Sequence, residues 1–137
     1  MFPWFLKQKA ENMSYTVASS TELPIPLATE AKKISIDNLG IRIKRATDAI
    51  FNEACEFINE QIEKGCLLAY FDFYSPVYRV DEKLDTNSII AAGSACVTRL
   101  EGFGYSAKLN GRYLEISWQY PKEITLDEAW TLAERYI

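Results

Sequence analysis

The sequence predicts an α+β fold, in which a mixed sheet of about three strands is covered by helices on one face. Two segments repeat apolar residues every three or four positions, which is typical of helices that pack on a core. An aromatic run at residues 66–74 and two runs joined by Asn110-Gly111 are typical of strands. We expect the order helix, strand, helix, strand, strand, helix over residues 35–137, preceded by an extended N-terminal arm at residues 1–34.

The longest predicted helix runs from about Ile43 to Lys64. Its apolar residues lie three or four positions apart, so they share one helical face. This face holds Ile43, Ala46, Ile50, Phe51, Ala54, Cys55, Ile58 and Ile62. Gly65 is expected to end the helix, because glycine readily adopts the left-handed backbone found just after a helix C-terminus.

Two further helices follow from capping signals. Asp85 or Thr86 is expected to cap a helix that ends at Gly102. Its predicted buried face holds Ile89, Ile90, Gly93, Cys96, Val97 and Leu100. In the last helix, at about 126–136, Thr125 and Glu128 have the spacing of a capping box. The residues that this helix is predicted to bury are Leu126, Ala129, Trp130 and Ala133.

The segment "GYSAKLNGRYLEISW" predicts a β-hairpin. A type I′ turn requires a positive φ at both central residues, which Asn110 and Gly111 tolerate. This register would pair Leu109 with Arg112 and gather the large apolar side chains on one face of the sheet. A shift by one residue would mix apolar and polar side chains on both faces.

The last strand is the most apolar part of the hairpin, so we place it at the centre of the sheet. The strand order is then 1-3-2, and the right-handed crossover from the first strand to the second makes these two run in the same direction. The order 1-2-3 is the alternative.

The N-terminal arm has a different composition from the rest of the chain. "MFPWFLKQK" is an aromatic cluster, and Pro24 and Pro26 favour extended backbone. Exposed aromatic side chains favour aggregation in water, so we expect them to dock into a groove, either of the same domain or of a neighbouring chain. The predicted partner-binding residues are Phe2, Trp4, Phe5, Leu23, Ile25 and Leu27.

The residue types exclude most catalytic chemistry. The chain has no histidine, which removes Ser-His-Asp and Cys-His arrangements and most zinc sites. It also lacks the glycine-rich motifs that hold nucleotide phosphates. Cys55, Cys66 and Cys96 lie in separate apolar runs and are expected to be reduced packing residues. We therefore expect a protein that is not an enzyme, with no catalytic residue, metal, cofactor or small-molecule substrate.

The charge pattern argues against two classes of partner. The chain has 15 Lys and Arg against 19 Asp and Glu, a formal net charge of −4. Nucleic-acid-binding domains normally present a basic face, because phosphate contacts supply much of their affinity. No apolar run approaches the roughly 18 residues of a membrane span, and "MFPWFL" lacks the positive start of a signal peptide. We expect neither a nucleic acid nor a membrane as partner.

Residues 44–118 resemble a pattern found in small α+β proteins of tailed bacteriophages. The resemblance is carried by the Ala- and Ile-rich helix with Gly65, the aromatic strand, the second helix, and "LEGFGYSAKLNGRYLEISW" at residues 100–118. These motifs are structural, and the resemblance brings no catalytic residues with it. It implies a phage-encoded protein, and together with the composition of the N-terminal arm it leads us to expect a virion protein made in the cytoplasm of a bacterial host.

The expected function is therefore that of a non-enzymatic virion structural or accessory protein in the head decoration (cement), neck or tail. Its expected partners are other virion proteins and further copies of itself, reached through the N-terminal arm. The alternative is a phage-encoded inhibitor that binds a host protein. A minor enzyme or ligand-binding domain is a third possibility.

Overall fold

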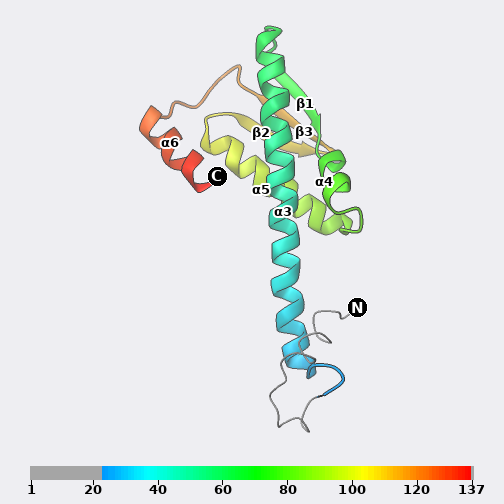
Figure 1. Ribbon diagram of the computed structural model, residues 1–137. Coiled ribbons are helices and arrows are strands. Elements are labelled where there is room, and N and C mark those ends of the chain that lie inside the picture. Colours follow the sequence, from blue (N-terminus) through cyan, green and yellow to red (C-terminus); the bar gives the residue numbers. More distant parts are fainter. Residues whose placement is uncertain (1–22, 137) are drawn as a thin grey trace. The chain divides into compact units, whose positions relative to one another are not determined.

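The computed structural model describes residues 23–136 (Figure 1). The chain divides into two compact units, residues 1–38 and residues 39–137. The described elements are α3 (Ala28–Glu63), β1 (Leu68–Asp72), α4 (Tyr74–Val80), α5 (Thr86–Gly102), β2 (Ser106–Asn110), β3 (Tyr113–Ser117) and α6 (Leu126–Arg135). The predicted α+β class is confirmed.

The first described helix begins earlier than the sequence predicts. α3 starts at Ala28, so residues 28–34 are helical and the prediction of an extended arm over them is wrong. Pro24 and Pro26 both precede the first turn, where no intrahelical N–H donor is removed. Residues 1–22 of the predicted arm lie outside the described residues.

The sheet has the predicted strand order, β1-β3-β2. Both pairs, β1 with β3 and β2 with β3, are antiparallel. β1 and β2 therefore run in the same direction, as expected, but they never pair because β3 lies between them. The prediction of a mixed sheet is wrong for this reason.

The hairpin register differs by two residues from the predicted one. Asn110 pairs with Tyr113, so the loop is Gly111-Arg112 and the predicted pairing of Leu109 with Arg112 does not form. Of the two loop residues, Gly111 has a positive φ, +63°, and Arg112 does not, which is what a type II′ turn requires. A two-residue shift leaves each strand residue on its predicted face, because side chains alternate with a period of two.

The core lies between one face of the sheet and the helices. The sheet contributes Ala69, Phe71, Ala107, Leu109, Leu114 and Ile116. The helices and Phe73, which lies between β1 and α4, contribute Ala46, Ile50, Ile58, Phe73, Val77, Ile89, Ala92, Cys96 and Leu100. On the opposite face of the sheet Leu68, Tyr70 and Tyr113 are exposed, so the helices cover one face, as predicted.

Two glycines end the long helices. After α3, Gly65 has φ +82°, and the N–H groups of Gly65 and Cys66 donate to Ile62 and Gln61 oxygens at 3.0 Å, which is a Schellman motif. After α5 the same role falls to Gly104, with φ +95°. α5 ends at Gly102, as predicted, but the residue with the positive φ that follows the helix is Gly104.

Some residues predicted to be buried are exposed. Ile62 of α3 and Ile90 of α5 both lie at the margin of the apolar stripe and are exposed to solvent.

The predicted strand at 66–74 is limited to β1, because Asp72 accepts hydrogen bonds from the Tyr74 N–H and the Ser75 hydroxyl and turns the chain into α4. Pro76 sits in the first turn of α4, a position where proline is tolerated.

Candidate functional site

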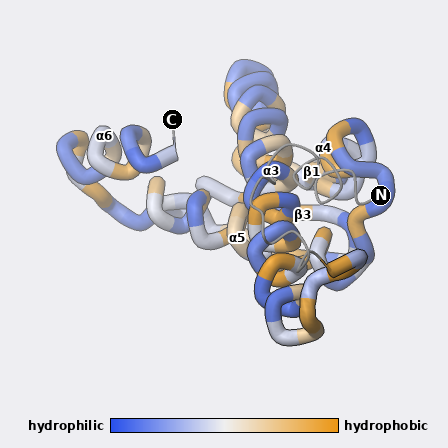
Figure 2. Tube along the Cα trace, turned by 60° about the horizontal axis from the view of Figure 1, so that its bottom comes forward, coloured by the Kyte–Doolittle hydropathy of each residue, from blue (hydrophilic) through white to orange (hydrophobic). Residues whose placement is uncertain are grey.

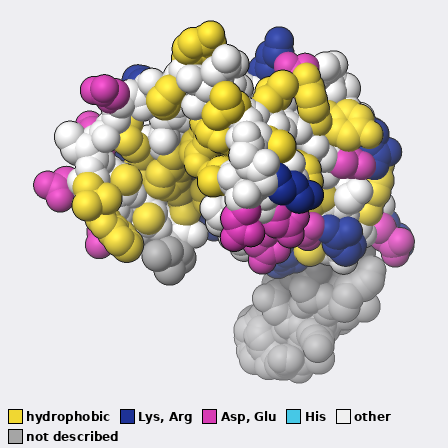
Figure 3. Space-filling model, turned by 90° about the horizontal axis from the view of Figure 1, so that it is seen from above, with side chains coloured by type: hydrophobic (Ala, Val, Ile, Leu, Met, Phe, Trp, Pro, Cys, Tyr) yellow, Lys and Arg dark blue, Asp and Glu magenta, His cyan; other side chains and the backbone are white. Residues whose placement is uncertain are grey.

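A groove of about 710 Å³ lies between α3, the end of α5 and α6. Figure 3 shows hydrophobic side chains gathered in the hollow beside α6, which is at the left of that view. The groove is lined by Phe51, Asn52, Cys55, Ile58, Asn59, Leu100, Phe103, Tyr105, Ile124, Thr125, Leu126, Ala129, Ala133 and Tyr136. None of these side chains is charged, and the volume is in the range of pockets that hold ligands.

The groove exists because α6 packs only partly on α3 and α5. The predicted capping box is present: the Thr125 hydroxyl accepts from the Glu128 N–H at 3.1 Å, and the Glu128 carboxylate accepts from the Thr125 N–H at 2.7 Å. No residue of α6 is fully buried, and the helix is mostly hydrophilic in Figure 2. Leu126 is 73% exposed and Trp130 is 62% exposed, so the prediction that α6 buries them is wrong.

The contacts of α6 gather at its C-terminal end. Leu132 packs so closely on Gly102 that a Cβ added there would lie 3.1 Å from Leu132 Cδ1. The Tyr136 ring lies 5.7 Å from the Phe51 ring and 6.4 Å from the Phe103 ring. The Leu126 end of the helix has no comparable anchor among the described contacts, and the groove opens beneath it.

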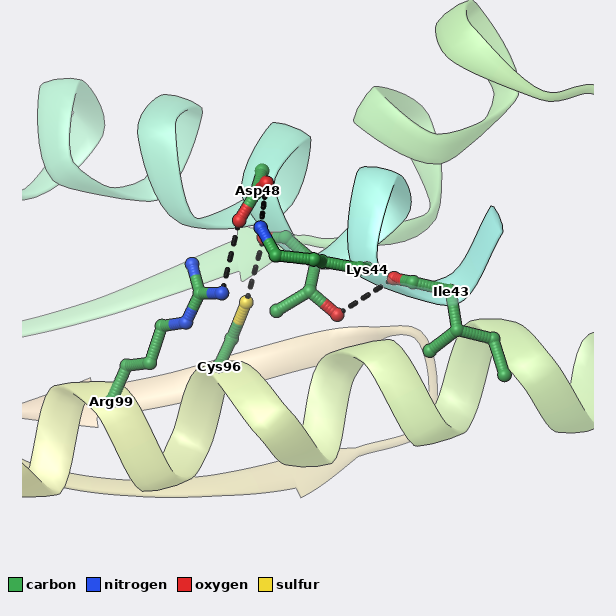
Figure 4. A network of polar contacts seen from close by, with 6 residues as sticks. Ile43, Lys44, Asp48, Cys96 and Arg99 are labelled. Carbon is green, nitrogen blue, oxygen red and sulfur yellow. Dashed lines mark hydrogen bonds and ion pairs between the residues drawn. The ribbon is translucent and has the colours of Figure 1, made fainter. Parts of the chain in front are cut away.

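Arg99 of α5 holds the C-terminal end of α6 through contacts with the rings of Tyr136 and Phe51. Its guanidinium carbon lies 4.5 Å from the centre of the Tyr136 ring and 5.3 Å from that of Phe51. Such cation–π contacts stabilise most when the cation is partly desolvated, and the Arg99 side chain is only 12% exposed. Arg99 also donates to Asp48 at 2.9 Å, which ties α5 to α3 (Figure 4).

The polar network behind the groove joins two helices. Asp48 accepts hydrogen bonds from Lys44 and Arg99, and Cys96 Sγ donates to the Thr47 carbonyl at 3.3 Å (Figure 4). Desolvation by partial burial raises the pKa of Asp48, but the hydrogen bonds from Lys44 and Arg99 outweigh it and leave this pKa below its ordinary value. The carboxylate therefore remains charged at neutral pH.

The thiols near the groove are poor nucleophiles. Burial raises the pKa of Cys55, although the positive charge of Arg99 opposes the shift. Burial raises the pKa of Cys96 to about 12. A thiol must lose its proton to attack an electrophile, so these groups stay in their unreactive form near neutral pH. All three cysteines are free, and Cys55 and Cys66 are half-buried.

Asp81 and Asp85, in the loop between α4 and α5, have structural partners. Asp81 accepts a two-pronged contact from Arg42 at 2.7 and 2.8 Å, and Asp85 caps α5 by accepting from Ser88. Across residues 23–136, no group of His, Cys, Asp and Glu side chains is arranged to hold a metal ion. In the same residues, no helix has both the length and the apolar character needed to cross a membrane.

The partner-binding residues predicted from the sequence lie in the first unit. Leu23, Ile25 and Leu27 are exposed to 49%, 61% and 64%, and they precede α3 in a segment without helix or strand. Phe2, Trp4 and Phe5 lie outside the described residues. The groove beside α6 was not predicted, because the apolar stripe of that helix was interpreted as core.

Comparisons of the chain with protein families, with curated proteins and with solved structures found no match.

Proposed function

We propose that this chain is a non-enzymatic bacteriophage virion protein, a head decoration, neck or tail component, which docks on neighbouring subunits through its N-terminal segment. The observation that carries the proposal is the exposure of Leu23, Ile25 and Leu27, three large apolar side chains within five residues. Clusters of exposed apolar side chains mark interaction surfaces. The virion assignment is supported by the resemblance of residues 44–118 to tailed-phage proteins.

The segment is suited to docking because it alternates apolar residues with prolines. Pro24 and Pro26 restrict the backbone before binding, which lowers the conformational entropy lost when the segment is ordered on a partner. Complete burial of a leucine or isoleucine contributes about 1.5–3 kcal/mol, so these half-exposed side chains would each add on the order of 1 kcal/mol. Many copies in one particle would multiply this modest affinity through avidity.

The proposal is tested by a matched pair of triple variants. Leu23→Ser, Ile25→Ser and Leu27→Ser together remove the apolar side chains of the segment. The control variant carries three serine substitutions at exposed apolar positions of the second unit, namely Leu67, Val80 and Tyr120. We expect the first variant to fold but to be lost from purified virions, and the control to be incorporated like the wild type.

The copy number of each variant in purified virions is measured by quantitative mass spectrometry. Equal incorporation of both triple variants would contradict docking through Leu23, Ile25 and Leu27. Absence of the wild-type chain from virions, combined with recovery of one bacterial protein in stoichiometric amount from a lysate, would instead favour an inhibitor of a host protein.

A further inference from the structure

We propose that the groove between α3 and α6 binds the first nine residues of a second copy of this chain, with the side chains of Phe2, Trp4 and Phe5 inserted. This inference rests on the proposed function, since it names the surface that receives the N-terminal segment of a neighbouring subunit. The groove lies wholly within residues 39–137, so each copy supplies one acceptor.

The chemistry of the groove matches that of the segment. Its lining includes Phe51, Phe103, Tyr105 and Tyr136 and no charged side chain, and the first six residues, "MFPWFL", carry no charged side chain either. Aromatic side chains gain from offset or edge-to-face contacts with other rings in addition to the burial of their surface. A cavity of about 150 Å³ accommodates one benzene ring, so a groove of 710 Å³ has room for several aromatic side chains.

The N-terminal segment and α6 carry opposite charges. The segment becomes basic directly after its apolar residues, at Lys7 and Lys9. α6, which forms one wall of the groove, carries three acidic residues, Asp127, Glu128 and Glu134, against the single base Arg135. Asp127 and Glu128 lie on the same side of α6 as Thr131, so the opposite charges favour the approach of the segment to this helix and not a contact inside the groove.

The chain is long enough to bridge two copies. Twenty-two residues precede Leu23, and an extended chain spans about 3.3–3.6 Å per residue, which gives a maximum reach of about 70 Å. Exchange of an identical element between protomers is a common way to build closed or open assemblies. One segment and one groove per copy would link subunits head to tail.

Binding is measured with the fluorescent peptide MFPWFLKQK and full-length protein in which Phe2, Trp4 and Phe5 are replaced by serine, so that its own segment cannot compete. We expect saturable one-to-one binding by fluorescence anisotropy. Asn59→Trp fills the groove from an exposed position on α3. It should raise the dissociation constant of the peptide at least tenfold, because it blocks the centre of the proposed interface. Thr131→Trp, on the side of α6 away from the groove, should leave the affinity unchanged.

The exchange between copies is tested by mixing two full-length proteins. One carries Asn59→Trp and keeps its N-terminal segment, and the other carries the three serine substitutions and keeps its groove. Each alone should sediment as a monomer, and their mixture should form a one-to-one complex. Circular dichroism confirms that each variant is folded, and Ala129→Trp, which fills the groove from α6, serves as the second groove variant.

Three outcomes would overturn the inference: no peptide binding, equal binding by the Asn59→Trp and Ala129→Trp proteins and the wild-type groove, or peptide binding without a complex in the mixture. The last result would mean that the segment occupies the groove of its own chain. These failures leave the virion assay untouched, since loss of the Leu23, Ile25 and Leu27 variant from virions could still be observed. Conversely, peptide binding by a chain that is absent from virions would retain the inference and refute the proposed function.

Discussion

Replacing Gly93 with alanine tests how closely α5 packs on the turn between β1 and α4. A Cβ at this position would lie 2.6 Å from Cε2 and 2.9 Å from Cδ2 of Phe73. Carbon atoms in van der Waals contact are normally about 3.5–4.0 Å apart. Phe73 is completely buried, so its ring cannot move towards solvent, and the surrounding core must shift instead.

The expected loss follows from two opposing effects. Overpacking a core costs about 1–3 kcal/mol, and replacing glycine by alanine inside a helix contributes about 0.5–1 kcal/mol of stability. Gly93→Ala should therefore lower the free energy of unfolding by about 1–2 kcal/mol. Gly40→Ala in α3 is the matched control, because an added Cβ there meets nothing within 4 Å. It should raise stability by about 0.5–1 kcal/mol.

Both variants are compared with the wild type by urea unfolding, followed by far-ultraviolet circular dichroism. A Gly93→Ala protein at least as stable as the wild type would mean that the Phe73 ring has space around it, and the packing argument would then be refuted. A loss of stability in both variants would show instead that glycine is needed for backbone reasons.

Three further outcomes follow from the polar contacts. Arg99→Ala should reduce stability by about 1–3 kcal/mol through loss of its ring and carboxylate contacts, and should raise hydrogen exchange in α6; unchanged exchange in α6 would contradict the anchoring role. The hydrogen bond from Arg42 lowers the pKa of Asp81, so the stability from this pair is present above the ordinary carboxyl pKa of about 4 and is lost as the pH falls through the lower folded-state value. In Asp81→Asn the free energy of unfolding should fall less steeply as the pH is lowered below about 4. An unchanged pH dependence would argue against a stabilising role of the Arg42–Asp81 pair. Cys96 should react with iodoacetamide at pH 8 far more slowly than Cys66 in folded protein, and at a similar rate in urea, as measured by mass spectrometry; equal rates before denaturation would contradict its burial.

The hairpin illustrates how far pattern reasoning extends. Alternation of apolar and polar side chains decides which face each residue occupies, because a one-residue shift exchanges the two faces. It does not distinguish registers that differ by two residues. The predicted loop is Asn110-Gly111, whereas the observed loop is Gly111-Arg112. The pairing of β1 and β2 with β3 decides between these two registers.

The sequence did not predict the groove. The N-terminal residues were singled out by their composition; Leu23, Ile25 and Leu27 are exposed, and their binding to a partner stays a prediction. The groove could not be derived from the sequence, since it depends on how far α6 stands from α3. The helix pattern gives an apolar face but not the distance to the surface that faces it.

By itself, the sequence determined the α+β class, the positions of α5 and the hairpin, and the capping box of α6, because these depend on local periodicity and on side chains close in the chain. Of the alternatives that the sequence left open, the structure selected the strand order β1-β3-β2 and Asp85 as the cap of α5. Tertiary structure alone decided the antiparallel sheet, the close contact of Gly93 with Phe73, and the positive φ of Gly104 after α5. It also decided that α6 is held at the Tyr136 end by Arg99. These features depend on contacts between residues far apart in sequence, whose spacing is set by the packing of the whole core.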